Sequence, residues 1–288
     1  MNPFVIHYVS GWPFFTGLFM ILIGSVLTFC PGWFVKSYLS RLLCVIGWLN
    51  IFFAAAPLPG LLFVALFLIV FAQVIVGGTE KISLKIRLGF AAVLAVVVLI
   101  AFFVELPHWM APGPLPLKAG GRVVIIGDSM SAGIGFAGEK TWGDLLHDEQ
   151  GMTVINRSVG GGTASTGVNS LEKTKVNKND IIVVEIGGND FFKGTHPDKF
   201  YKDLEQLLSE AKRKSPNVIM FELPLPFLKK SFGRTQRELA EKYKVRLIPK
   251  YQFGNILVGT GSIHDGLHLS NKGHRKMAKV VLSYIDQK

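Results

Sequence analysis

Residues 123–133 read Val-Val-Ile-Ile-Gly-Asp-Ser-Met-Ser-Ala-Gly. The four β-branched residues form an uninterrupted apolar run, which predicts a strand that is buried on both faces. Gly-Asp-Ser follows directly, and residues of these types predict a tight turn. The hydroxyl group of Ser129 is therefore expected at the exposed end of a buried strand.

The C-terminal part of the chain continues this alternation of short apolar runs and helical stretches. The pattern predicts strands over residues 122–126, 153–155, 180–186, 217–222 and 244–248. It predicts helices over residues 142–150, 165–175, 197–214, 232–243 and 271–287. Apolar strands separated by helices indicate an α/β fold with a parallel sheet that helices cover on both faces. In such folds, functional groups gather beyond the carboxyl ends of the strands.

The N-terminal part has a different composition. The first 117 residues carry only five of the 31 basic and two of the 20 acidic residues of the chain. Four apolar runs approach the ~20 residues needed to span a bilayer, and they cover residues 12–29, 42–56, 60–76 and 88–106. The second run is short, which leaves the number of spans open. The predicted organisation is an all-α transmembrane region of about four helices (1–106), a Pro-rich linker (107–118) and one globular domain (119–288).

The basic residues between the apolar runs predict the orientation of this region. Lys81, Lys85 and Arg87 lie between the third and fourth runs, and short basic loops stay in the cytoplasm. The chain then crosses the membrane once more before the globular domain. We therefore expect an integral protein of a bacterial inner membrane, with its globular domain on the extracytoplasmic side. A cleaved signal peptide is less compatible with the first run, because a basic segment does not precede it.

Charge and cysteine content narrow the possible partners. The net charge is +11, but the chain has no nucleic-acid-binding motif, so a lipid bilayer is a more natural partner than a nucleic acid. Cys30 and Cys44 are the only cysteines, which excludes a disulfide framework in the globular domain. We expect neither a metal nor a cofactor, because His264 beside Asp265 and His268 lacks a further cluster of ligands.

Polar and glycine-rich clusters occur at four predicted strand or helix boundaries. They are Gly-Asp-Ser at 127–129, Asn-Arg-Ser-Val-Gly-Gly-Gly-Thr at 156–163, Gly-Gly-Asn-Asp at 187–190 and His-Asp-Gly-Leu-His at 264–268. Each cluster alone is a weak signal. Because three of them follow parallel strands, we expect all four to meet at one edge of the sheet.

The residue types in these clusters suit nucleophilic catalysis. A serine hydroxyl becomes a good nucleophile when a base removes its proton, and His268 can act as that base while Asp265 holds its ring. Attack on an ester produces an oxyanion, which needs preorganised hydrogen-bond donors. The backbone N–H of Ser129, a glycine N–H of the second cluster and the side-chain amide of Asn189 can supply them.

The four motifs resemble those of the SGNH (GDSL-type) hydrolases over residues 119–288. The matching stretches are Ile-Gly-Asp-Ser-Met-Ser-Ala-Gly, Ile-Asn-Arg-Ser-Val-Gly-Gly-Gly-Thr, Val-Glu-Ile-Gly-Gly-Asn-Asp and Asp-Gly-Leu-His-Leu-Ser. Within the family, the chain looks most like the thioesterase I / lysophospholipase L1 and arylesterase group. The resemblance implies a flavodoxin-like three-layer fold. It also implies roles for five residues: Ser129 as nucleophile, Asp265 and His268 as its partners, and Gly161 and Asn189 in the oxyanion hole.

The resemblance leaves some details open. Gly161 is placed by its spacing from Asn156, and Gly160 or Gly162 would be one-residue alternatives. The sequence departs from the family pattern at Met130, where leucine is frequent, and at Gly162, where a polar residue is frequent. Apolar residues near the site could line an acyl pocket or touch lipid, although plain packing explains them equally well: Met130, Phe191, Phe192, Leu225 and Phe227.

The sequence therefore predicts a membrane-anchored serine esterase. It would hydrolyse acyl esters of lysophospholipids, other acyl lipids or lipoprotein-type substrates through an acyl-serine intermediate at the outer face of the membrane. One alternative is an O-acetyl esterase or acyltransferase that acts on cell-surface glycans. A second is a membrane adaptor that uses the fold without catalysis.

Overall fold

The computed structural model describes residues 7, 8, 10–30, 32, 34–77, 79, 82–225 and 230–287. These residues form two compact units, here called the N-terminal unit (residues 7–110) and the C-terminal unit (residues 111–287). Lys81, which contributed to the predicted orientation, and Phe227, which was assigned to the acyl pocket, lie outside the described residues.

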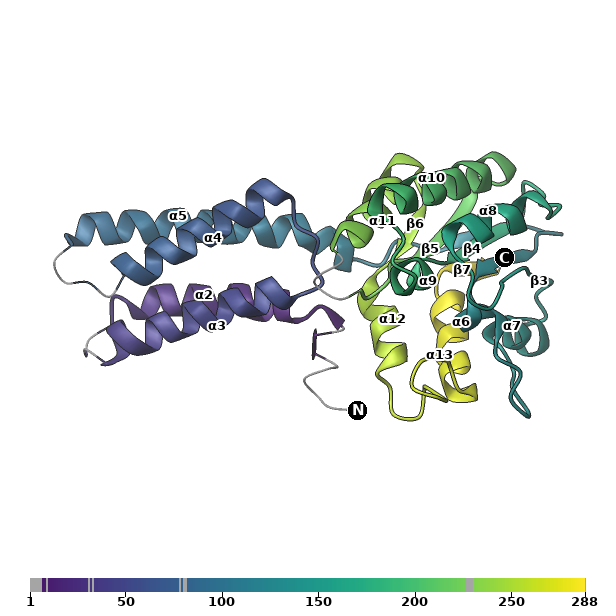
Figure 1. The fold of residues 1–288 in the computed structure, drawn as a ribbon, viewed down its shortest axis with the longest axis horizontal. Helices are drawn as coiled ribbons and strands as arrows, with labels where there is room; N and C mark the ends of the chain where they lie inside the picture. The colour runs from purple at the N-terminus through teal and green to yellow at the C-terminus, as the bar shows by residue number, and fades with distance from the viewer. Residues whose placement is uncertain are drawn as a thin grey trace. The chain divides into compact units, whose positions relative to one another are not determined.

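The N-terminal unit is built from apolar helices. They are α2 (Pro13–Leu27), the π-helical segment η1 (Val35–Leu39) that continues into α3 (Ser40–Phe53), α4 (Gly60–Val76) and α5 (Leu84–Glu105), which is followed by the 3-10 turn η2 (Leu106–Trp109) (Figure 1). Each helix coincides with one of the four apolar runs. The third run matches α4 at both ends, because two prolines precede Gly60 and stop the chain from continuing α3.

Small residues bring α2 and α3 into close contact. A Cβ atom added at Gly47 would lie 2.7 Å from the carbonyl oxygen of Gly17, and one added at Gly24 would lie 2.7 Å from that of Ser40. Side chains larger than hydrogen would therefore force the two backbones apart. Close approach through small residues is typical of helices that pack within a membrane.

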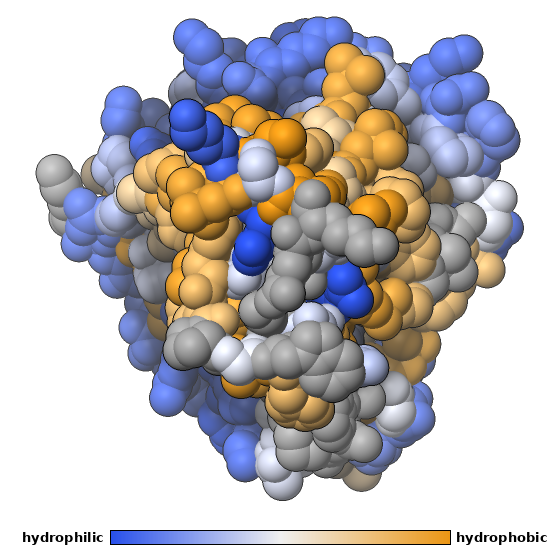
Figure 2. Space-filling model, turned by 90° about the vertical axis from the view of Figure 1, so that its left-hand side faces the viewer, coloured by the Kyte–Doolittle hydropathy of each residue, from blue (hydrophilic) through white to orange (hydrophobic). Residues whose placement is uncertain are grey.

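One described helix is long and apolar enough to cross a membrane. It covers Leu84–Trp109, and its most apolar 18-residue window has a mean hydropathy of 2.7 and is 22% buried, whereas α2, α3 and α4 are shorter apolar helices. Large apolar side chains such as Phe19, Phe71 and Phe103 are exposed on the unit, and Figure 2 shows hydrophobic residues gathered on the face turned to the viewer. Membrane crossing by the three shorter helices stays a prediction.

The C-terminal unit contains a five-stranded parallel sheet, as the sequence predicts. Its strands are β2 (Val123–Gly127), β3 (Val154–Asn156), β4 (Ile181–Glu185), β5 (Asn217–Phe221) and β6 (Arg246–Ile248). Their spatial order is β3-β2-β4-β5-β6. Every residue of β2 and β4 is buried, which accounts for their uninterrupted apolar sequences.

Helices cover both faces of this sheet (Figure 1). On one face, Val123, Ile125, Ile181 and Val183 pack with α7 (Trp142–Gln150), α12 (Lys250–Leu257) and α13 (Asn271–Leu282). On the other face, Val124, Ile126, Ile182 and Val184 pack with α8 (Ala164–Glu172), α10 (Pro197–Lys214) and α11 (Lys230–Lys242). Successive residues of a strand thus enter opposite cores, and the unit has the three-layer α/β architecture that the sequence predicts.

The structure differs from the predicted elements near the C-terminus. The helix predicted over 271–287 ends at Leu282, and Ile285–Gln287 forms strand β7, which pairs in parallel with β1 (Leu115–Leu117). Strand β1 lies within the segment predicted as a Pro-rich linker. Neither strand has a β-branched apolar run, because proline interrupts the first and two polar residues end the second. Helix α12 and the short helices that carry Ser129 and Asn189 were likewise absent from the prediction.

Candidate active site

Ser129 begins the short helix α6 (Ser129–Ala132), directly after β2. Asp128 caps this helix, because one of its carboxylate oxygens accepts a hydrogen bond of 2.9 Å from the backbone N–H of Met130. Gly127 is sterically required, since a Cβ atom there would lie 2.6 Å from the Oγ atom of Ser131. The strand, the glycine and the cap together place partly exposed Ser129 at the carboxyl edge of the sheet.

Asp265 and His268 form a pair within one closed turn. The His268 Nδ1 atom lies 2.7 Å from one Asp265 oxygen, while the other oxygen accepts from the backbone N–H groups of His268 (2.8 Å) and Leu267 (3.1 Å). The backbone N–H of His268, followed by its ring, holds the pKa of Asp265 well below its usual range. An ionised Asp265 favours the proton on Nδ1, which leaves Nε2 of His268 able to accept another proton.

The turn that carries this pair is fixed by local backbone geometry. Ile263 and Leu269 form an antiparallel bridge, and the N–H of His264 donates to the carbonyl of His268 at 2.8 Å. Gly266 has φ +92°, a conformation that residues with a side chain seldom adopt. The Asp-x-x-His spacing in the sequence is therefore the spacing of a turn that directs both side chains to the same side.

Asn189 lies in α9 (Gly188–Phe192), immediately after β4. Its side-chain Nδ2 atom donates a hydrogen bond of 2.9 Å to the Oδ2 atom of Asp128, which joins the third cluster to the first. Gly187 makes this approach possible with φ +118°. This hydrogen bond fixes the orientation of the planar Asn189 amide, and therefore also the direction of its second N–H.

Gly161 occupies the turn that follows β3. Its φ is +69°, and its carbonyl oxygen accepts a hydrogen bond of 2.7 Å from Lys193 Nζ. The neighbouring N–H of Gly162 donates to the carbonyl of Val159 at 2.8 Å, and the N–H of Val159 donates to Gly127 at 3.0 Å. The N–H of Gly162 is thus already engaged, which weakens this alternative to Gly161 as an oxyanion donor.

The first and third clusters therefore come together at one edge of the sheet. Asp128 is the common neighbour, because it bonds Asn189 directly and adjoins Ser129 in the chain. Burial raises the pKa of Asp128, and the nearby His268 acts in the opposite direction.

The sequence analysis did not anticipate a buried pair of carboxyl groups beneath the site. Glu185 is 1% exposed and Asp128 is 4% exposed, and Glu185 lies opposite Gly127 in the β2–β4 register. Glu185 Oε2 accepts from Ser131 Oγ at 2.8 Å, and this hydroxyl accepts from Trp142 Nε1 at 3.2 Å. Burial, and then the charge of Asp128, raise the pKa of Glu185 well above its ordinary value. Of the two carboxyl groups, Glu185 is therefore the one whose proton burial and the neighbouring charge favour more strongly.

The predicted pocket residues have different environments. Met130 is 9% exposed and belongs to the hydrophobic core, whereas Phe192 is 64% exposed. Phe191 and Leu225 are partly buried, and Leu225 packs against both cores. Among the described residues, three or more His, Cys, Asp or Glu side chains do not gather in an arrangement suited to a metal ion.

Known proteins match the C-terminal unit. The chain belongs to the GDSL-like Lipase/Acylhydrolase family, which it matches over residues 125–276. It is 30% identical over 165 residues to an arylesterase of Vibrio mimicus, which covers 52% of this chain and 81% of the relative. It is 29% identical over 161 residues to thioesterase 1/protease 1/lysophospholipase L1 of Escherichia coli strain K12, which covers 52% and 76%. The protein is accordingly an ester-hydrolysing serine hydrolase.

Proposed function

We propose that this protein is a membrane-anchored serine esterase that cleaves acyl esters of lipids at the outer face of the membrane. The observations that support the proposal are the hydrogen-bonded Asp265–His268 pair and the contact between Asn189 and Asp128, the residue that precedes Ser129. The names of the relatives, which include an arylesterase and a lysophospholipase, support an acyl ester as the substrate.

The proposed reaction proceeds in two steps. His268 Nε2 takes the proton of the Ser129 hydroxyl as its oxygen attacks the ester carbonyl, and Asp265 stabilises the resulting imidazolium. The N–H groups of Ser129, Gly161 and Asn189 stabilise the oxyanion. Collapse of the intermediate transfers the proton to the leaving alcohol and leaves the acyl group on Ser129. Water, activated by His268, then releases the acid and restores the serine.

Exposed apolar side chains accompany the four site segments and support a substrate with a hydrocarbon chain. In the part of the C-terminal unit that the structure describes, four large hydrophobic side chains are strongly exposed: Ile134, Val159, Phe192 and Leu267. Each follows or lies within a different one of the four site segments. Single exposed apolar residues are ordinary on a protein surface, but this distribution places one beside each of the converging clusters.

Two arginines of the N-terminal unit support the proposed orientation. Arg41 Nε donates to the carbonyl of Val74 at 3.0 Å, and Arg87 donates to the carbonyl of Thr28. Both therefore lie at the end of the unit where α2 and α4 finish and where α3 and α5 begin. Arginines at one end of apolar helices favour the cytoplasmic side for that end. The opposite end of α5, which leads into the C-terminal unit, would then lie on the outer side.

Substitution of Ser129 tests the proposed reaction. In the purified full-length protein, Ser129→Ala is expected to lower kcat for ester hydrolysis by on the order of a million-fold, as removal of a serine nucleophile does elsewhere. It is also expected to abolish labelling by a fluorophosphonate probe. Ser209→Ala, which changes an exposed serine of α10, should retain both properties. Normal turnover by the Ser129 variant would refute the site.

Product analysis tests the lipid substrate. Membranes that contain the active protein are expected to be depleted of an acyl lipid that accumulates with the Ser129→Ala variant, and free fatty acid should be the released product. Mass analysis with an added glycan acceptor distinguishes hydrolysis from transfer, because transfer would yield an acylated sugar in place of the free acid.

A further inference from the structure

Glu139 lies in the loop between α6 and α7, and its carboxylate closes that loop on itself. The side chain is only 7% exposed. Its Oε2 atom accepts hydrogen bonds from the backbone N–H groups of Ile134 (2.9 Å) and Gly135 (2.5 Å). A buried carboxylate requires such donors. The loop that continues from the Ser129 helix thus wraps around an acidic side chain of its own.

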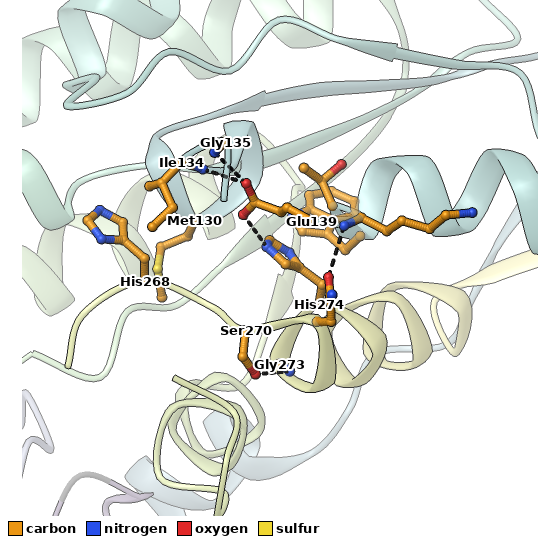
Figure 3. Close-up of polar contacts among 12 residues, drawn as sticks. Met130, Ile134, Gly135, Glu139, His268, Ser270, Gly273 and His274 are labelled. Atoms are coloured by element: carbon orange, nitrogen blue, oxygen red, sulfur yellow. Dashed lines mark hydrogen bonds and ion pairs between the residues drawn. The ribbon is translucent and has the colours of Figure 1, made fainter. Parts of the chain in front are cut away.

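The second oxygen of this carboxylate reaches α13. Glu139 Oε1 lies 3.2 Å from Nε2 of His274, whose side chain is 1% exposed (Figure 3). Burial lowers the pKa of His274, although Glu139 partly opposes this effect. The neutral ring carries its one proton on Nε2, because the carboxylate oxygen that faces this atom accepts hydrogen bonds. The Nδ1 atom is buried without a hydrogen-bond partner among the described residues. His274 is therefore the donor in this contact.

Further contacts join the same loop to Asn271, at the start of α13, and to His264, which directly precedes Asp265. The Asn271 side chain bonds both sequence neighbours of Glu139: its Nδ2 donates to the carbonyl of Gly138 and its Oδ1 accepts from the N–H of Lys140, each at 2.9 Å. The ring of Phe136 stacks on His264 with centroids 4.4 Å apart and planes 9° apart. The chain between His264 and His274 carries Asp265 and His268. It is therefore attached at both ends to the loop that follows Ser129.

We propose that Glu139 and His274 are positioning residues, which set the distance between the Asp265–His268 turn and Ser129. The inference rests on the proposed function, because it assumes the roles given there to these three residues. The turn is closed by its own hydrogen bonds, so its internal shape does not depend on His274. Its placement beside Ser129 does depend on the loop. Figure 3 shows His268 preceding Ser270 and α13, with the Glu139 carboxylate directed at His274.

A pair of substitutions at His274 separates positioning from simple stability. His274→Leu removes the N–H donor, whereas His274→Gln retains one at about the position of Nε2. On a short soluble ester such as p-nitrophenyl butyrate, His274→Leu is expected to lower kcat by about 10- to 100-fold with little change in KM, because small displacements of reacting groups cost this much. His274→Gln is expected to restore most of the loss.

A pH profile, with kcat/KM expressed per fluorophosphonate-labelled molecule, tests whether the Asp265–His268 turn keeps its internal geometry in the variant. The Asp265–His268 hydrogen bond is internal to the turn, so the acidic limb of kcat/KM is expected to keep its midpoint in His274→Leu while the plateau falls. Asp148→Asn is a matched control, because it removes an exposed ion pair with Lys140 that does not reach α13. This control is expected to keep the full kcat.

The outcomes separate this inference from the proposed function. A wild-type protein that neither hydrolyses esters nor labels at Ser129 would overturn both. If the wild type is active and His274→Leu keeps the full kcat per labelled molecule, the positioning role alone would be overturned. A kcat in His274→Gln as low as that in His274→Leu would overturn it as well. Should His274→Leu not fold, Glu139→Gln replaces it, because it keeps an oxygen for the N–H groups of Ile134 and Gly135 but turns an amide toward His274. Unchanged kcat in Glu139→Gln would also overturn the inference.

Discussion

At the scale of single residues, Asp128 organises the site without a proposed part in proton transfer. One of its oxygens caps the helix that begins with Ser129, and the other holds the amide of Asn189. Glu185 lies behind it, and the charge of Asp128 adds to burial in raising the pKa of Glu185, which disfavours two buried negative charges together. A single aspartate thus aligns both the nucleophile and a proposed oxyanion donor.

Loss of the Asn189 amide should affect the transition state more than substrate binding. We expect Asn189→Ala to lower kcat by on the order of 100-fold with KM nearly unchanged, because an oxyanion donor acts on charge that develops during the reaction. Steady-state kinetics on a soluble ester measure this effect. Asn169→Ala, which changes an exposed residue of α8, serves as the control. A rise in KM at constant kcat would assign Asn189 to ground-state binding instead.

The raised pKa of Glu185 makes a prediction about stability against pH. The folded protein keeps the proton that the unfolded chain releases above the ordinary value of 4.5, so stability falls as pH rises from there toward the folded-state pKa. Glu185→Gln cannot ionise. As pH rises through this window, the free energy of unfolding of Glu185→Gln is therefore expected to increase relative to that of the wild type by up to about 1.4 kcal/mol per pH unit. Thermal unfolding between pH 4 and 8 measures the difference, and parallel curves would contradict the assignment.

At the scale of elements, glycine contacts decide how α2 and α3 pack. Gly47→Ala would place a methyl group 2.7 Å from the Gly17 carbonyl, and overpacking of this kind typically costs about 1–3 kcal/mol. A lower unfolding temperature in detergent is expected. Gly89→Ala in α5 is the matched control, because its added Cβ atom meets nothing within 4 Å. Equal effects of the two variants would show that the glycines act through helix propensity and not through packing.

At the scale of the whole molecule, the proposed topology can be tested by labelling. Cysteines introduced at Ser83, just before α5, and at Ser209, on α10, should lie on opposite sides of the membrane. In a chain that lacks Cys30, an impermeant maleimide is expected to modify Ser209→Cys in intact spheroplasts and Ser83→Cys only after permeabilisation. Labelling of Ser83→Cys from outside would reverse the proposed orientation.

Much of the architecture could be predicted because its signals are local. Helices α7 and α10 begin and end where the sequence pattern placed them, with a capping box at Thr141 and Asp144 in the first case. The apolar runs of β2 and β4 likewise mark buried parallel strands. Strands β1 and β7 escaped prediction because Leu115-Pro116-Leu117 contains a proline and Ile285-Asp286-Gln287 continues a helical pattern with polar residues.

The sequence by itself determined the order of strands and helices along the chain, the four clusters at their ends and the Asp265–His268 spacing. Each of these depends on residues that are close together in the chain, where periodicity, glycine conformation and turn geometry act directly. The tertiary structure alone decided that Asn189 meets Asp128, that Glu185 lies beneath Ser131, and that Glu139 meets His274. These partners are 61, 54 and 135 residues apart, so their contacts exist only because sheet register and helix packing bring distant segments together.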